Sequence, residues 1–250
     1  MSAIAVAAAL RIIGIKFGLP QAFHPDEPIL VLATQRFFQG DFNPHNFYYP
    51  SLLMYMMHAV QRFYYAFTTS PIELAELYVL SRLTVAFIGI ASLLVVYKLG
   101  KEIFNKSVGL VAALFLAVSP LHVINSHYAT TDVPLAFFIL LTILFTIFLY
   151  RQGSWKHYLL TGLFLGLTVS TKIPGGVVFV SILLAHFIRI KNEYALQYWA
   201  LIKESISLKK LVWFGLAGLL VCFSILLVFY NFHIIADFII DTFEPALWIN

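Results

Sequence analysis

The stretch VLSRLTVAFIGIASLLVVYK, residues 79–98, decides the fold class. It is almost entirely apolar, and about 20 such residues make a helix long enough to cross the hydrocarbon core of a membrane. Similar runs predict seven spans in all, at residues 3–19, 79–98, 108–126, 133–150, 156–172, 174–190 and 211–231. The predicted fold is therefore an all-α, polytopic membrane bundle of about seven transmembrane helices.

The composition excludes a water-soluble protein. Apolar residues make up 61% of the chain and charged residues 11%, whereas soluble domains are close to half apolar and a quarter charged. The single cysteine, Cys222, excludes a disulfide or a cysteine-based metal site within the chain. Neither GxxxxGK[ST] nor GxGxxG is present, so nucleotide chemistry has no support. No nucleic-acid partner is expected.

One further apolar run, residues 51–67, carries a polar stripe at helical spacing. The stripe comprises Ser51, Tyr55, His58, Arg62 and Tyr65. Such a pattern favours an amphipathic helix that lies in the membrane interface over one that crosses the bilayer. With this helix outside the bilayer, residues 20–78 form one long loop between the first two spans.

Basic residues then collect on one side of the membrane. Ten of the sixteen lie at or beside the loops on that side: Lys98, Lys101, Lys106, Arg151, Lys156, Arg189, Lys191, Lys203, Lys209 and Lys210. Loops rich in Lys and Arg stay in the cytoplasm. The sequence therefore predicts a multi-pass protein of the cell membrane with a cytoplasmic N-terminus, an extracytoplasmic 20–78 loop, and a chain that ends outside at Asn250.

Two acidic motifs fall on the predicted outer face, where nine of the twelve carboxylates gather. FHPDEP at 23–28 contains Asp26 and Glu27, and SHYATTDVP at 126–134 contains Asp132. Because each acid stands at a Pro-marked helix start, N-capping is the structural alternative to catalysis. A cap and a catalytic role are compatible for Asp26, since a cap would hold the carboxylate at the membrane surface.

Three cations lie within or at the ends of the predicted spans: Arg11, Arg82 and Lys172. A charge in a span usually faces a partner or a polar cavity, and snorkelling to the interface is the structural alternative. For Lys172, at a turn between spans, a functional role is favoured.

Aromatic and histidine side chains accompany the motifs. Tyr48 and Tyr49 precede Pro50. An aromatic belt at the membrane interface explains these two tyrosines more simply than substrate binding does. His24, His45 and His127 could join Asp26 or Glu27 around a divalent cation. No tight ligand spacing such as HxxxH is present, so a metal is the weaker interpretation, and no cofactor is predicted with certainty.

In this order, the motifs resemble the glycosyltransferase C superfamily. The resemblance rests on His24-Pro25-Asp26-Glu27 after the first span, Tyr-Pro before the loop helix, Arg82 opening a span, and Ser119-Pro120 and SHYATTDVP after it. It is strongest to the branch of protein O-mannosyltransferases and lipid A aminoarabinose transferases. That branch favours a Lys before the Pro of the loop helix, where this chain has Tyr49, so the acceptor class stays open.

The resemblance implies an enzyme that moves a sugar from a polyprenyl-phosphate donor to a protein, glycan or lipid acceptor on the extracytoplasmic face. An in-line displacement of the phosphate would invert the anomeric centre. The resemblance implies Asp26, Asp132 and Glu27 as catalytic acids, and Lys172 and Arg82, with Arg11, as cations near the donor phosphate. His24, Tyr48, Tyr49 and His127 are candidate substrate-binding residues. It also implies that residues 1–250 form a single transmembrane core without the further spans and outer domain of longer members.

Two other classes of function compete with this interpretation. A transporter would use the same charges to line a solute path, but no inverted repeat of broken spans is seen. A non-catalytic subunit of a glycan-assembly complex is the other alternative, and an outer loop without paired acids would have favoured it.

Overall fold

The computed structural model describes residues 2–21, 23–45, 49–68 and 71–193, together with residues 212, 215, 216 and 218. Within these residues the chain forms helices and no strand, as the composition predicts. The predicted span 211–231 and the predicted outer end at Asn250 lie outside this part of the chain, apart from the four isolated positions.

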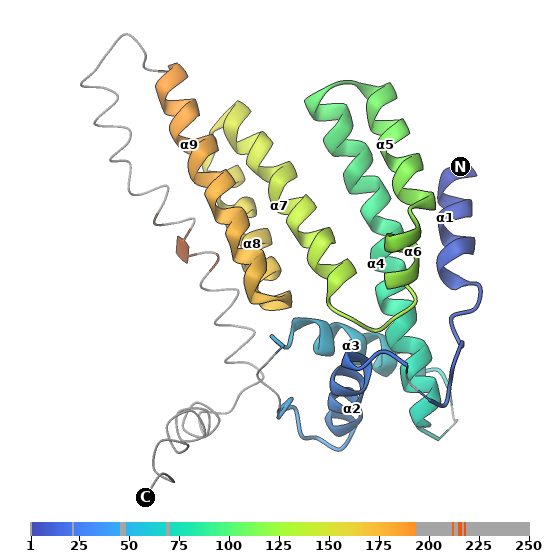
Figure 1. Cartoon of the computed structure of the whole chain (residues 1–250). Helices are drawn as coiled ribbons and strands as arrows, with labels where there is room; N and C mark the ends of the chain where they lie inside the picture. Colours follow the sequence, from blue (N-terminus) through green and yellow to red (C-terminus); the bar gives the residue numbers. More distant parts are fainter. Residues whose placement is uncertain are drawn as a thin grey trace, which may run out of the picture.

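Most helices run roughly side by side and form the body of the molecule (Figure 1). In chain order they are α1 (Ser2–Ile12), α4 (Leu74–Ile103), α5 (Lys106–Val118), α6 (Pro120–Asn125), α7 (Asp132–Gln152), α8 (Trp155–Thr171), the 3-10 helix η1 (Ile173–Val178) and α9 (Phe179–Glu193). Three segments of the described chain are long and apolar enough to cross a membrane: Leu74–Ile103, Asp132–Gln152 and Ile173–Ile190.

Within the described part of the chain, the other predicted spans are shorter or broken, so seven crossings are not confirmed. Residues 3–19 were expected to be one helix, but α1 ends at Ile12. Gly14 and Gly18 have φ of +82° and +74°, a left-handed backbone that ends a helix and that glycine tolerates best. Residues 108–126 divide into α5 and α6 at Ser119, because Pro120 has no N–H to continue the hydrogen-bond ladder.

α4 and α5 pack closely against each other. A Cβ on Gly100 would stand 2.6 Å from the Cα of Gly109, so the two backbones meet where neither residue has a side chain. Small residues permit this close approach between membrane helices. Asn105 begins α5, and its side chain accepts the N–H of Val108 at 3.0 Å.

The long loop folds into two helices, α2 (Asp26–Phe38) and α3 (Leu52–Tyr65), that pack at one end of the upright helices (Figure 1). The polar stripe predicted that α3 would not cross the bilayer with the spans, and α3 indeed does not run alongside them (Figure 1). Its stripe is only partly exposed, however: His58 is 8% exposed and lies among the rings of Phe37, Phe38 and Phe42. The exposed side of α3 instead includes Val60 and Phe63, and Phe67, just after the helix, is exposed as well. These side chains suit a face turned to lipid.

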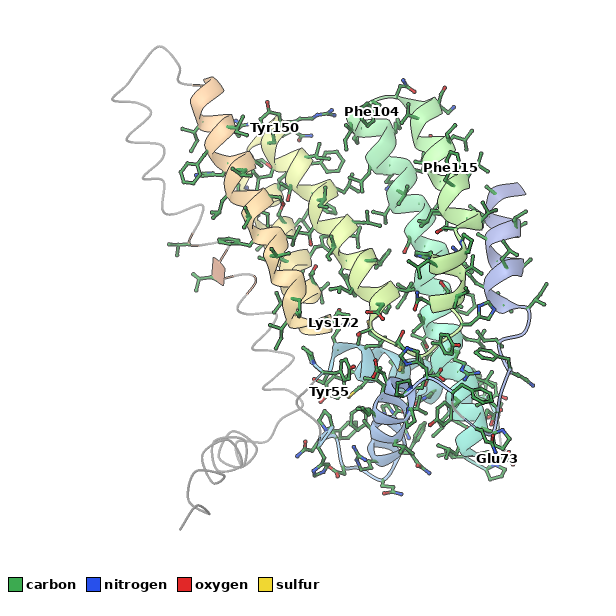
Figure 2. The ribbon with its side chains drawn as sticks, in the orientation of Figure 1. Tyr55, Glu73, Phe104, Phe115, Tyr150 and Lys172 are labelled. Atoms are coloured by element: carbon green, nitrogen blue, oxygen red, sulfur yellow. The ribbon has the colours of Figure 1, made fainter. Side chains whose placement is uncertain are left out.

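The chain alternates between the two ends of the bundle. The turns at 104–105 and 153–154 lie at one end, while α2, α3, the 126–131 loop and Lys172 lie at the other (Figures 1 and 2). An ion pair between Arg151 and Glu102, 2.8 Å apart, joins the two turns at the first end. The two acidic motifs therefore share one end of the molecule.

Candidate active site

Asp26 is the first residue of α2, and its carboxylate is partly exposed. The Asp26 N–H donates to Nδ1 of His24 at 3.2 Å. Nδ1 is therefore an acceptor, and the ring proton of a neutral His24 lies on Nε2. The same Nδ1 stands 4.0 Å from an Asp26 carboxylate oxygen, which is too far for a hydrogen bond.

N-capping, the structural alternative for both acids, has no support in this arrangement. The cap residue of α2 is Pro25 and that of α7 is Thr131, and neither helix start has a side-chain capping hydrogen bond. Asp132 is instead the first residue of α7, and it pairs with Lys172. Both acids thus keep carboxylate oxygens that helix capping does not use.

Glu27 lies at the centre of a buried polar hub. Its Oε1 accepts from Nε of Arg82 and its Oε2 accepts from Nη2, each at 2.8 Å, and both side chains are 0% exposed. The N–H of Ala129 also donates to Oε1 at 2.8 Å. A bidentate, charge-assisted pair of this kind fixes both partners in position and direction.

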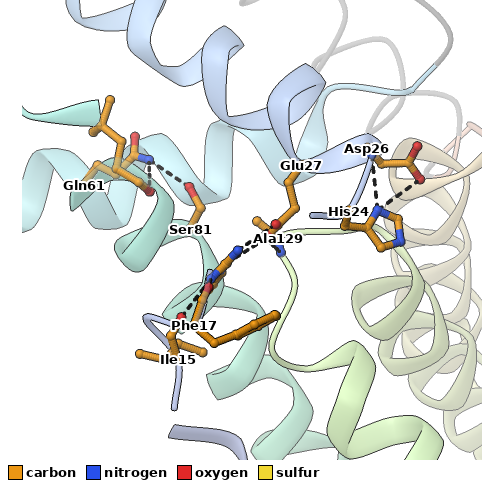
Figure 3. Close-up of polar contacts among 10 residues, drawn as sticks. Ile15, Phe17, His24, Asp26, Glu27, Gln61, Ser81 and Ala129 are labelled. Carbon is orange, nitrogen blue, oxygen red and sulfur yellow. Dashed lines mark hydrogen bonds and ion pairs between the residues drawn. The ribbon is translucent and has the colours of Figure 1, made fainter. Parts of the chain in front are cut away.

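Arg82 extends the hub to the segment after α1. Its Nη1 donates to the carbonyl oxygens of Ile15 at 3.0 Å and Phe17 at 2.8 Å, and its guanidinium carbon is 4.7 Å from the centre of the Phe17 ring. The hub joins α2, α4, the 126–131 loop and the segment after α1 (Figure 3). Asp26, next to Glu27, is held by this hub through the backbone.

In this structure Arg82 and Glu27 bind each other and the surrounding backbone. Every guanidinium nitrogen of Arg82 donates to a protein oxygen, and the side chain is fully buried, so it does not face a donor phosphate. Both carboxylate oxygens of Glu27 are equally engaged. The geometry therefore separates the two neighbouring acids, with Glu27 buried and Asp26 accessible.

Lys172 is the cap residue that follows α8, and its side chain reaches the start of α7. Its Nζ donates to Oδ1 of Asp132 at 2.9 Å, and the lysine and aspartate side chains are 34% and 47% exposed. This ion pair lies at the same end of the bundle as Asp26. The His24 ring, beside Asp26, contacts the Tyr128 ring, with centres 5.0 Å apart. Tyr128 lies in the loop that leads to Asp132. Lys172 is the one predicted phosphate-binding cation that the structure leaves accessible.

Arg11 is buried in α1 and does not join this group. Its Nη1 donates to Ala117 O at 3.0 Å, and its Nη2 donates to Leu116 O at 3.0 Å and lies 3.0 Å from Nδ1 of His122. Both carbonyl groups lie in the last turn of α5, which ends before Pro120. The structure thus uses Arg11 to attach α1 to the α5–α6 junction.

The predicted substrate-binding side chains do not lie together in one site. His127 holds the 126–131 loop in place, with Nδ1 2.9 Å from Val123 O and Nε2 3.1 Å from Ile13 O. Tyr49 is 6% exposed within the core around α2 and α3, and Tyr48 lies outside the described residues. His24 alone stays beside Asp26.

The described residues give no geometric support for a metal site. His45 pairs with Asp41, 2.7 Å apart and four residues away in the same loop. Among the described residues, no three His, Cys, Asp or Glu side chains come together as a metal site would require.

Sequence reasoning missed the groups that complete the hub. The Ala129 N–H and the Ile15 and Phe17 carbonyl groups are backbone atoms, so no residue type marks them. Gln61, also missed, is 0% exposed and donates to Ser81 Oγ at 3.0 Å and Leu77 O at 3.3 Å. Its polar side chain within the apolar run of 51–67 was a usable signal for burial against another helix.

Comparison with known sequences adds a family match. Residues 78–230 match the family described as dolichyl-phosphate-mannose-protein mannosyltransferase. The match covers more than half of the chain and includes Arg82, Asp132 and Lys172, whereas Asp26 and Glu27 precede it. None of the curated proteins matches the chain.

Proposed function

The chain belongs to the dolichyl-phosphate-mannose-protein mannosyltransferase family, and on that premise we propose that it transfers a sugar from a polyprenyl-phosphate donor to an acceptor hydroxyl. Transfer takes place at the end of the bundle that carries α2 and α3. Family membership makes the chain a membrane glycosyltransferase. We further propose the class of sugar donor, the residues that catalyse the transfer and the side of the membrane on which it takes place.

One observation carries the assignment of the site. An accessible carboxylate at Asp26, the first residue of α2, and an accessible ammonium at Lys172 lie at the same end of the bundle, although they come from distant parts of the chain (Figures 1 and 2). Transfer from a sugar phosphate needs these two charges, because one group takes a proton and the other balances the departing phosphate.

The reaction is a single displacement. Asp26 takes the proton from the acceptor hydroxyl as its oxygen forms a bond to the anomeric carbon. The bond from that carbon to the phosphate oxygen breaks, and its electron pair leaves with the polyprenyl phosphate. Lys172 stabilises the negative charge that gathers on that phosphate. Attack from the face opposite the leaving group inverts the anomeric centre.

The bundle places this chemistry at a membrane surface. A polyprenyl chain stays in the bilayer, so its phosphate lies at the headgroup layer, level with the helix ends that carry Asp132 and Lys172. The predicted cytoplasmic loops are at the opposite end. We therefore place the site on the extracytoplasmic face, with the exposed apolar side of α3 in the lipid beside it.

A transfer assay with two labelled donors tests the donor class. Membranes that contain the chain are given polyprenyl-phosphate mannose or GDP-mannose with a serine- and threonine-containing acceptor peptide. We expect labelled peptide from the lipid-linked donor alone, and a strong loss of product with Lys172→Ala. Product from GDP-mannose but not from the lipid-linked donor would overturn the proposal.

A further inference from the structure

A cavity of about 430 Å³ opens at the start of α4, on a part of the molecule that sugar transfer does not use. It is lined by Lys16, Tyr64, Pro71, Glu73, Glu76, Val79, Leu80 and Leu83. None of these residues belongs to the Asp26, Asp132 and Lys172 group, and Glu73 lies well away from Lys172 (Figure 2). The cavity is therefore a separate site.

The lining divides into a polar mouth and an apolar wall. Lys16, Glu73 and Glu76 supply the charges of the mouth. Val79, Leu80 and Leu83 supply the wall, and they follow one another along α4, a helix long and apolar enough to cross a membrane. A molecule that fills this cavity must have a charged head and an apolar part in contact with α4.

The polar groups are held in place by the fold. Tyr64 and Tyr65 each donate to one oxygen of Glu76, at 2.6 and 2.7 Å. Lys16 stands between Ile15 and Phe17, the two residues whose carbonyl groups are fixed by Arg82. The mouth thus has a rigid acid on one side and a cation on a fixed backbone on the other.

Two charges of the mouth remain available to a ligand. Glu73 is the cap residue of α4, but its side chain makes no capping hydrogen bond. Neither Glu73 nor Lys16 forms an ion pair within the described part of the chain. One ammonium and two carboxylates give the mouth a net charge of −1, which disfavours an anion without a cation of its own.

We propose that this cavity binds a phospholipid with a phosphoethanolamine headgroup. The lipid phosphate pairs with Lys16, the lipid ammonium donates to the Glu73 carboxylate, and an acyl chain lies along Val79 and Leu83. A choline headgroup fits less well because its ammonium has no N–H to donate. A glycerol headgroup fits less well because it brings a negative charge and no cation.

Lipid binding to the purified chain in detergent tests this assignment without reference to sugar transfer. Native mass spectrometry compares phosphatidylethanolamine, phosphatidylcholine and phosphatidylglycerol with the same acyl chains. We expect the wild type to retain phosphatidylethanolamine preferentially. Lys16→Ala and Glu73→Gln should each weaken this binding by about threefold to tenfold, since each removes one partly screened charge contact. Lys106→Ala, an exposed lysine at the other end of the bundle, should leave it unchanged.

Charge reversal at the mouth provides a second test that does not depend on loss of binding. Glu73→Lys changes the net charge of the mouth from −1 to +1, so the preference should pass to phosphatidylglycerol. Equal binding of all three lipids, or a lipid preference that none of the variants alters, would overturn the proposal. Water-soluble phosphoethanolamine that binds as tightly as the lipid would also overturn it, because the apolar wall would then contribute nothing.

Discussion

Asp26 and Glu27 are adjacent in the chain, yet their surroundings differ completely. Glu27 is fully buried and bound to Arg82 and Ala129, whereas Asp26 is partly exposed beside His24. Successive helix residues point about 100° apart, so one can face the bundle while its neighbour faces outward. At the residue scale, this difference makes Glu27 the candidate for a role in stability and Asp26 the candidate for the proposed chemistry.

Glu27→Gln should therefore damage stability first. The substitution leaves the buried Arg82 without a counter-charge, a change that costs roughly 3–5 kcal/mol in buried pairs. Thermal unfolding in detergent should show a large drop in the melting temperature. Asp41→Asn breaks the exposed pair with His45 and should have little effect. Equal melting temperatures for Glu27→Gln and the wild type would contradict the role of the hub.

At the scale of helices, His58 joins α3 to the aromatic side chains of α2. Burial, together with the positive charge of Arg62, lowers the pKa of His58 to about 4, whereas a histidine in an unfolded chain titrates near 6.5. Between these two values the unfolded chain binds more protons than the folded one, so stability must fall as the pH falls.

The pH dependence of stability should reveal this histidine. Wild-type protein should lose about 1–3 kcal/mol between pH 6.5 and pH 4 through His58. His58→Gln, which cannot titrate, should lose less over the same range in thermal unfolding measured at each pH. Parallel stability profiles for the two proteins would show that the α2–α3 contact does not depend on a neutral His58.

The ends of α7 and α8 are joined by the ion pair of Asp132 and Lys172. If Lys172 binds the donor phosphate, Asp132 competes with that phosphate for the same ammonium. Asp132→Asn should therefore strengthen binding of polyprenyl phosphate by about threefold to tenfold, measured by titration of the purified protein. Its transfer rate should fall less than that of Asp26→Asn. Weaker binding by Asp132→Asn would indicate that the carboxylate orients Lys172 toward the donor.

The sequence predicted the positions of the helices more fully than it predicted the side-chain contacts at the candidate site. Apolar runs located α4, α7 and α9, since length and hydropathy are local properties of the sequence. The early end of α1 was missed because an apolar run can contain a turn, and Gly14 and Gly18 were the available signal. The pairing of Glu27 with Arg82 was missed because the two residues are 55 positions apart and meet only through tertiary folding.

For the whole molecule, the family predicted from the order of the motifs is confirmed by the match over residues 78–230. The predicted number of spans is not confirmed. Both acidic motifs lie at one end of the described bundle, and the turns at 104–105 and 153–154, which basic residues flank, lie at the other. Which end faces the cytoplasm stays a prediction based on the placement of Lys and Arg.

Cysteine labelling tests this orientation. After Cys222 is replaced by Ala, single cysteines are placed at Asp41 and Ile72, on either side of α3, and at Asn105 at the opposite end. An impermeant thiol reagent applied to intact cells should label the first two sites and not the third. Labelling of Asn105 alone would reverse the orientation, and different results at Asp41 and Ile72 would mean that α3 crosses the membrane.

The central claim is that Asp26 is the base in sugar transfer, and Asp26→Asn tests it most directly. The amide keeps the size of the side chain but cannot take a proton at neutral pH. The variant should reach the membrane and melt near the wild-type temperature, since Asp26 lies outside the buried hub. Its rate of transfer from polyprenyl-phosphate mannose should fall by roughly 10²–10⁴. Transfer by Asp26→Asn at close to the wild-type rate would contradict the account.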